Sequence, residues 1–288
     1  MRHPILAFLI VAALLAPAAA QTGAQGVTGL GPGLPQTPAR PVALRLSAFF
    51  ANTQVPVRAG LQWRVYADQT DGTQTLAARS SDAAPTFSLT PGNYTVHAAY
   101  GFASAVKRVV LSDTTIERLS IGAGAIRIMG TIGDTPIPPA RLNFSVYVPV
   151  NNNSEGSLVI ANAKGGDVIR LPEGNYHVVS NYGDSNAIVR ADLKVEIGKI
   201  TDATLNHRAA TVTLKLVRSA GGEAFAGTAF SVLTPGGDVV REAIGAFPSF
   251  VLAEGDYVVI ARHEGQVYTR EFKVTPGLDR DIEVTAKQ

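Results

Sequence analysis

The sequence contains no cysteine among its 288 residues. Without cysteine the chain can form no disulfide, no Cys-ligated zinc site, no thiolate nucleophile and no lipidated N-terminal cysteine. Any folded part must therefore be stabilised by the burial of apolar side chains. The composition, with 46% hydrophobic residues, supplies enough of them for packed cores.

Charged residues are few and balanced. They make up 17% of the chain, and 25 Lys and Arg against 23 Asp and Glu leave a net charge of +2. No run of one sign occurs. Nucleic acids and anionic membrane surfaces attract proteins that concentrate positive charge, so we expect neither as a partner.

Long apolar segments are also missing, apart from one at the N-terminus. Met1, Arg2 and His3 precede the apolar run "ILAFLIVAALLA", and small residues follow at Ala18 and Ala20. As a helix this run covers about 18 Å, which is too short for a bilayer core of about 30 Å. We predict a cleaved signal peptide at residues 1–20 and no membrane span after cleavage, rather than an uncleaved anchor. The protein is then expected in the periplasm or outside the cell, and the sequence does not distinguish between the two.

Residues 21–41 contain five glycines and four prolines and have no apolar periodicity. Such a composition is typical of a flexible linker.

One motif occurs three times after this linker. The chain contains "FSLTPGNYTVHAAYG" at 87–101, "IRLPEGNYHVVSNYG" at 169–183 and "FVLAEGDYVVIARHEG" at 250–265. Around each copy, apolar and polar residues alternate, with Gly, Pro, Asn or Asp every eight to twelve residues. This pattern predicts an all-β protein of three antiparallel, Ig-like β-sandwich domains at 42–124, 125–210 and 211–288. Each is expected to have about seven strands.

The shared core of the motif is Leu-x-x-Gly-x-Tyr-x-Val. A glycine at a turn with a tyrosine two residues later is typical of a tyrosine corner, in which the buried phenol hydroxyl bonds to backbone upstream. The predicted corner residues are Gly92, Tyr94, Gly174, Tyr176, Gly255 and Tyr257. Counting in twos from the tyrosines predicts inward-facing residues at Val96, Ala98, Val178, Ser180, Val259 and Ala261.

The Leu-x-x-Gly-x-Tyr-x-Val pattern resembles the tandem prealbumin-like, carboxypeptidase-regulatory-like and Cna-B-type domains of bacterial envelope proteins. The resemblance covers residues 42–288, although other sandwiches, including fibronectin type III, have a similar corner. It implies a role as a stalk, a spacer, or an adhesion or binding module.

We find no pattern typical of catalysis or metal binding. The five histidines lack metal-ligand spacing, and neither a Gly-x-Ser-x-Gly motif nor a phosphate-binding loop occurs. By strand parity His97 and His177 should point outward, and all five histidines are expected on the surface. The sequence thus predicts a protein that is not an enzyme and has no metal or cofactor.

Polar loops are the remaining candidates for binding. One loop runs from Asn151 to Gly156, and two further loops, Gly101–Ser104 and Gly183–Asn186, each follow a copy of the motif. Tyr100 and Tyr182 could stack on sugar rings, but their even spacing from the corner tyrosines favours packing at the end of the core. The candidate binding residues are Asn151, Asn152, Asn153, Tyr182, Asp184 and Asn186.

These observations predict a non-enzymatic, exported cell-envelope protein that acts as a spacer or protein-interaction module. The alternative is a glycan- or peptidoglycan-binding protein that uses loops at one end of a sandwich. The partner, an envelope protein or a glycan, is not identified by the sequence.

Overall fold

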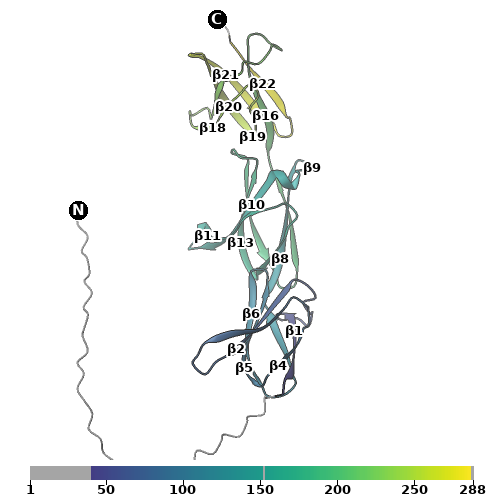
Figure 1. Cartoon of the computed structure of the whole chain (residues 1–288). Coiled ribbons are helices and arrows are strands. Elements are labelled where there is room, and N and C mark those ends of the chain that lie inside the picture. Colours follow the sequence, from purple (N-terminus) through teal and green to yellow (C-terminus); the bar gives the residue numbers. More distant parts are fainter. Residues whose placement is uncertain (1–39, 152, 287–288) are drawn as a thin grey trace, which may run out of the picture. The chain divides into compact units, whose positions relative to one another are not determined.

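The computed structural model describes residues 40–151 and 153–286 (Figure 1). The predicted signal peptide, nearly all of the linker and Asn152 lie outside the described residues. Residues 40–286 belong to one compact unit. No helix in these described ranges is long and apolar enough to cross a membrane.

The described chain is built from strands, with a single 3-10 turn, η1 (Pro139–Arg141). The first repeat contains β1 (Val42–Phe50), β2 (Leu61–Asp68), β3 (Gln74–Ser80), β4 (Thr86–Leu89), β5 (Gly92–Tyr100), β6 (Ala103–Leu111) and β7 (Thr115–Ile121). The second contains β8 (Ala123–Ile132), β9 (Thr135–Pro136), β10 (Leu142–Val150), β11 (Asn153–Ala163), β12 (Val168–Pro172), β13 (Gly174–Tyr182), β14 (Ile188–Val195) and β15 (Ile200–Asn206). The third contains β16 (Ala209–Val217), β17 (Ala229–Leu233), β18 (Val239–Ile244), β19 (Ser249–Ala253), β20 (Gly255–His263), β21 (Gln266–Val274) and β22 (Arg280–Thr285).

Each repeat forms two sheets of the same topology. In the first repeat the sheet orders are β4-β1-β7 and β3-β2-β5-β6, and the other two repeats follow the same scheme, with the short β9 added beside β8. The all-β prediction and the number of strands in each repeat are confirmed. Strands β8 and β16 begin slightly before the predicted repeat boundaries, and independent folding of each repeat stays a prediction.

One feature of the sheets departs from the antiparallel scheme. The first and last strands of each repeat pair in parallel: β1 with β7, β8 with β15, and β16 with β22. The chain crosses to the other sheet between these strands, so it returns in the original direction. Hydrophobic alternation is the same for parallel and antiparallel neighbours, and for this reason the sequence did not reveal the parallel pairs.

The core of each repeat is centred on an aromatic residue of its second long strand. Trp63, Phe144 and Phe230 are each at most 1% exposed. The residues predicted to face inward on β5, β13 and β20 are all fully buried: Val96, Ala98, Val178, Ser180, Val259 and Ala261. Burial of a large apolar side chain contributes about 1.5–3 kcal/mol, so these alternating residues hold the sheets together.

Candidate interaction surfaces

Each copy of the motif places a buried tyrosine beside the strand end that precedes it. The hydroxyl groups donate hydrogen bonds to carbonyl oxygens four residues upstream: Tyr94 to Thr90 at 2.7 Å, Tyr176 to Pro172 at 3.0 Å, and Tyr257 to Ala253 at 2.9 Å. Burial raises the pKa of Tyr176 and Tyr257 above the usual value of a phenol. These are the hydrogen bonds that a tyrosine corner requires.

The glycine of the motif lies directly under the tyrosine ring. Gly92, Gly174 and Gly255 are the first residues of β5, β13 and β20. At Gly174 the backbone has φ +157°, and a Cβ there would lie 3.8 Å from the ring of Tyr176. Gly255 has the same φ, so in these two copies the backbone angle favours glycine, while the ring itself would leave a Cβ in ordinary van der Waals contact.

The loop after β5 contacts the second repeat. The backbone N–H of Phe102 donates to the carbonyl of Arg170 at 3.0 Å, and the Arg170 guanidinium lies 5.2 Å from the centre of the Tyr100 ring. Gly101 has φ +62°, and a Cβ on it would lie 2.5 Å from Cβ of Arg170. Only glycine fits this contact without a shift of backbone.

The loop after β13 makes the equivalent contact with the third repeat. The Asn186 side chain donates to the hydroxyl of Tyr257 at 2.9 Å and accepts from the backbone N–H of Ala253 at 3.0 Å. Asp184 forms an ion pair with Arg241 at 2.5 Å. One asparagine thus joins its own loop to the tyrosine corner of the next repeat.

Tyr182 is also part of this junction. It is 4% exposed and belongs to the same hydrophobic cluster as Val251 of the third repeat. Its ring has the guanidinium of Arg141 at 4.9 Å and the ring of His207 at 5.8 Å. A Cβ on Gly183, at φ +73°, would lie 2.9 Å from Cβ of Val251. The sequence named Tyr182, Asp184 and Asn186 as candidate binding residues and favoured packing at the end of the core for Tyr182. In the structure Tyr182 is buried, and Asp184 and Asn186 bond to the third repeat.

The polar loop of the second repeat has a different setting. Strand β10 pairs with β13 only as far as Tyr147, whereas its pairing with β11 continues to Val150. The end of this hairpin therefore extends beyond the sheet, and it carries Asn151 and Asn153. Three aliphatic side chains near it are exposed: Val148 by 37%, Val150 by 44% and Leu158 by 54%.

Two histidines that were expected on the surface are buried. His177 is 7% exposed, lies between Tyr147 and Asp192 on the outer face of the sheet, and has its Nδ1 2.7 Å from Oδ1 of Asp192. His207 is 1% exposed, and its Nε2 lies 2.8 Å from Oγ of Ser180. Parity predicted the outer face of His177 correctly, but it does not account for neighbouring side chains that cover a residue. His207 lies outside the strands, and its exposure was expected only because the histidines lack metal-ligand spacing.

Ser180 and His207 are residue types that can serve as a nucleophile and a base, but in this pair they are not accessible to a substrate. Ser180 is fully buried, so a substrate cannot reach its hydroxyl. Burial lowers the pKa of His207 below its ordinary value, and the nearby carbonyl of Ala187 opposes this effect in part. Among the described residues no group of three or more His, Asp or Glu side chains could hold a metal ion.

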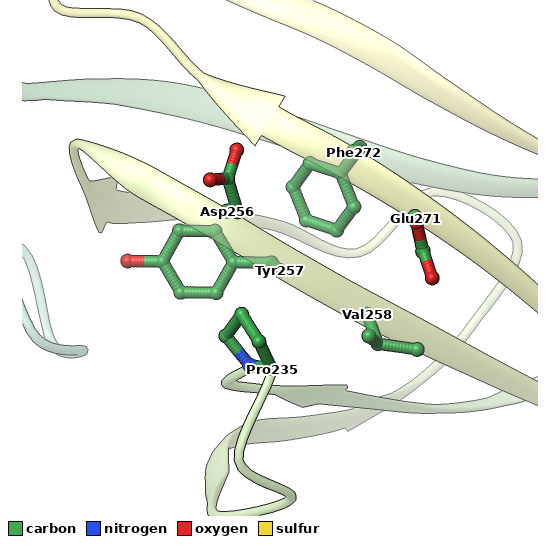
Figure 2. Close-up of a pocket in the computed structure, with 6 residues that line it drawn as sticks. All are labelled: Pro235, Asp256, Tyr257, Val258, Glu271 and Phe272. Carbon is green, nitrogen blue, oxygen red and sulfur yellow. The ribbon is translucent and has the colours of Figure 1, made fainter.

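A surface recess on the third repeat lies beside its tyrosine corner (Figure 2). It has a volume of about 470 Å³ and is bordered by Pro235, Asp256, Tyr257, Val258, Glu271 and Phe272. The rings of Tyr257 and Phe272 stack at 5.6 Å, and Figure 2 shows the carboxylates of Asp256 and Glu271 flanking Phe272. Sequence reasoning missed this recess because β20 and β21 bring together residues 15 positions apart.

Comparison with known proteins gives one family match, which covers part of the chain. A model described as the Rhizobiales growth-associated tandem repeat domain matches residues 211–286, the third repeat. No curated protein matches the sequence. The family match supports the resemblance to tandem repeat domains that the motif indicated.

Comparison with solved structures gives matches of low sequence identity, including the three that follow. The Bacillus anthracis TIE protein is 17% identical over 86% of this chain, with a TM-score of 0.27, and this chain spans 50% of that protein. A streptococcal ancillary pilin is 12% identical over 86% of this chain and 99% of its own, with a TM-score of 0.30. A shaft pilin from Lactobacillus rhamnosus GG is 11% identical over 58% of this chain and 97% of its own, with a TM-score of 0.31.

Proposed function

We propose that the protein is an exported, non-enzymatic structural protein of the cell envelope. Its repeats act as a spacer and present a protein-interaction surface. The observation that carries this proposal is the junction at Asn186, where one side chain makes two hydrogen bonds to the next repeat. A spacer must hold each repeat in a defined position relative to the next one. Loops that contact the following repeat can do so.

Both junctions use the same element, which supports a role in coupling rather than a chance contact. The hairpin loop after the motif contacts Arg170 in the first case and Val251 and Ala253 in the second. These partners lie on β12 and β19, the corresponding strands of the following repeats. The coupling is therefore repeated along with the scaffold.

The interaction surface that we propose is the end of the β10–β11 hairpin. Val148, Val150 and Leu158 are exposed aliphatic residues outside the three cores. Leu158 pairs with Tyr147 and Val148 pairs with Ser157, so Leu158 and Val148 point to opposite faces of the hairpin, and a partner that clasps the hairpin end would contact apolar groups on both faces. The neighbouring Asn151 and Asn153 supply the polar groups that border such contacts.

Export rests on the predicted signal peptide at residues 1–20. N-terminal sequencing of the protein recovered from periplasm or medium should give Gln21. Full-length protein in the cytoplasm would contradict the proposal.

Coupling between repeats can be tested with the variant Asn186→Ala. The matched control is Asn175→Ala, which replaces an exposed asparagine on β13. Scanning calorimetry should show the third repeat unfolding separately and at lower temperature in Asn186→Ala, because two partly buried hydrogen bonds are lost. Small-angle X-ray scattering should then show a broader distribution of dimensions. If Asn186→Ala behaves like Asn175→Ala in both measurements, the junction does not couple the repeats.

The interaction surface can be tested with the double variant Val150→Ser and Leu158→Ser. Pulldown from envelope extracts should recover a specific protein with the wild type and lose it with the variant. Retention on purified glycans without a protein partner would instead support the alternative, a glycan-binding protein.

A further inference from the structure

The outward face of the four-stranded sheet in the first repeat gathers positive charge. The sheet order is β3-β2-β5-β6. Arg79 lies directly opposite Arg64, and Arg64 lies opposite His97, so these three side chains form one row across the sheet. Arg108 stands in the next row, opposite Thr95.

These side chains point away from the core. Trp63 and Val65, on either side of Arg64, are at most 1% exposed, so the alternation along β2 places Arg64 outside. Arg79 and Arg108 are also exposed, and His97 is half-buried. Because neighbouring strands lie about 4.8 Å apart, the row from Arg79 to His97 spans about 10 Å.

Stability of the sheet does not account for this row. Like charges directly opposite each other on adjacent strands destabilise a sheet. None of the ion pairs in residues 40–151 and 153–286 includes Arg64, Arg79 or Arg108. Asp68, the acidic residue of β2 on the same face, accepts hydrogen bonds from Thr95 instead.

The other repeats show that the scaffold does not need arginine here. The third repeat has Ser231, Glu242, Ile260 and Glu271 at the positions of Arg64, Arg79, His97 and Arg108. The second repeat has Ser145, Val179 and Asp192 at the positions of Arg64, His97 and Arg108. The cationic row is therefore specific to the first repeat.

A recess lies beside the row. It has a volume of about 360 Å³ and is bordered by Gln62, Trp63, Arg64, Arg79, Ser80 and Ser81. The two guanidinium groups and the side chains of Gln62 and Ser81 can donate hydrogen bonds to a ligand, whereas the Ser80 hydroxyl already donates to Asp82 at 3.0 Å. The recess thus supplies neutral donors next to the charged ones.

We propose that this face binds an acidic polysaccharide, a linear glycan that carries carboxylate or phosphate groups. Guanidinium groups bind both kinds of anion through paired hydrogen bonds. One small anion cannot contact side chains spread over about 10 Å, whereas a polymer with repeated anionic groups can lie across the strands and contact several. The proposal does not depend on the spacer function or on the junctions.

The test uses the full chain and polygalacturonate as the acidic glycan, with neutral dextran as the uncharged control. The triple variant Arg64→Gln, Arg79→Gln, Arg108→Gln should bind polygalacturonate about tenfold more weakly than the wild type, as expected for the loss of three exposed charge contacts. A matched triple variant, Arg40→Gln, Arg58→Gln, Arg218→Gln, removes the same charge from exposed positions elsewhere and should bind as tightly as the wild type. Wild-type binding should also weaken as salt is raised.

Three results would overturn the proposal: no binding of polygalacturonate, equal loss in both triple variants, or tighter binding to dextran. Poly-glutamate and vesicles with anionic phospholipid form two further arms, and preferential binding to either would assign the face to an acidic protein or a membrane instead. The melting temperature of each variant is measured alongside. If the triple variant does not fold, Arg79→Gln alone should still weaken binding by about twofold, because one exposed contact is lost.

Discussion

The hairpin loop that follows the motif occurs three times, and its third copy differs from the first two. Gly101 and Gly183 occupy the turn in the first and second repeats, with φ +62° and +73°, and Glu264 occupies it in the third, with φ +47°. In the first two copies an added Cβ would lie 2.5–2.9 Å from an atom of the next repeat. The Glu264 side chain is 86% exposed. The turn itself therefore accepts a side chain, and the glycines are required by the junction.

The largest effect on stability is expected when the glutamate that the third copy has at this turn replaces Gly101 in the first copy. Gly101→Glu puts a side chain into the backbone of Arg170 and should lower the free energy of unfolding by about 3 kcal/mol or more, through overpacking and strain at positive φ. The reciprocal Glu264→Gly should change it by about 1 kcal/mol or less. Urea unfolding measures both. Equal effects would show that the turn, and not the junction, selects glycine.

The next largest effect on stability is expected at the corner tyrosines. The hydroxyl of Tyr257 bonds to the preceding repeat, and that of Tyr176 bonds within its own repeat. Tyr176→Phe removes one hydroxyl hydrogen bond and should cost about 1–3 kcal/mol. Tyr257→Phe should cost about 1 kcal/mol more, because its hydroxyl also accepts from Asn186. Thermal unfolding of both variants checks the order, and a Tyr176→Phe protein as stable as the wild type would mean that the ring packs without needing its bond.

The two junctions should also differ in their response to pH. His207 in the second junction corresponds to the fully buried Ile121 in the first. Burial lowers the pKa of His207 below 6.5, so below that pH the unfolded chain takes up a proton that the folded protein does not. Stability from this residue is present above pH 6.5 and falls as the pH drops towards the lowered pKa, by at most about 1.4 kcal/mol per pH unit.

Urea unfolding between pH 7.5 and 5 should therefore show a smaller pH dependence for His207→Gln than for the wild type. The control is His97→Gln, which replaces a half-buried histidine on the outer face of the first repeat. An unchanged pH dependence in His207→Gln would show that His207 is not responsible.

The smallest effect is expected at the exposed part of the second junction. The Asp184 and Arg241 side chains are 63% and 37% exposed, and exposed ion pairs contribute about 0.2–1 kcal/mol. Asp184→Asn should lower the melting temperature only slightly and less than Asn186→Ala does. A larger loss for Asp184→Asn would assign the coupling to charge rather than to the asparagine.

The fold was predictable from the sequence because its main signals are local. Alternation along each strand predicted the inward residues of β5, β13 and β20, and the repeated glycine and tyrosine predicted the hydrogen-bonded corners. The parallel pairing of β1 with β7 was not predictable, since the alternation of a strand does not depend on the direction of its neighbour.

The surfaces were predictable only in part. Asn186 and Tyr257 are 71 residues apart, and no local pattern indicates that they bond. Arg64, Arg79 and Arg108 are likewise scattered in sequence and become neighbours only through the register of the sheet. The hairpin end at Asn151 and Asn153 could be named because polar loops are visible in the sequence, but its exposed aliphatic residues are visible only in the structure.

The parallel pairing of first and last strands determines how each repeat responds to mechanical force. The strands that lead into and out of a repeat lie side by side, joined over seven residue pairs in the first and second repeats and six in the third. Tension applied through the two ends of a repeat pulls these strands in opposite directions along their length. The hydrogen bonds between them are then loaded in shear and share the force, whereas the bonds of a hairpin pulled open from one end would break one after another.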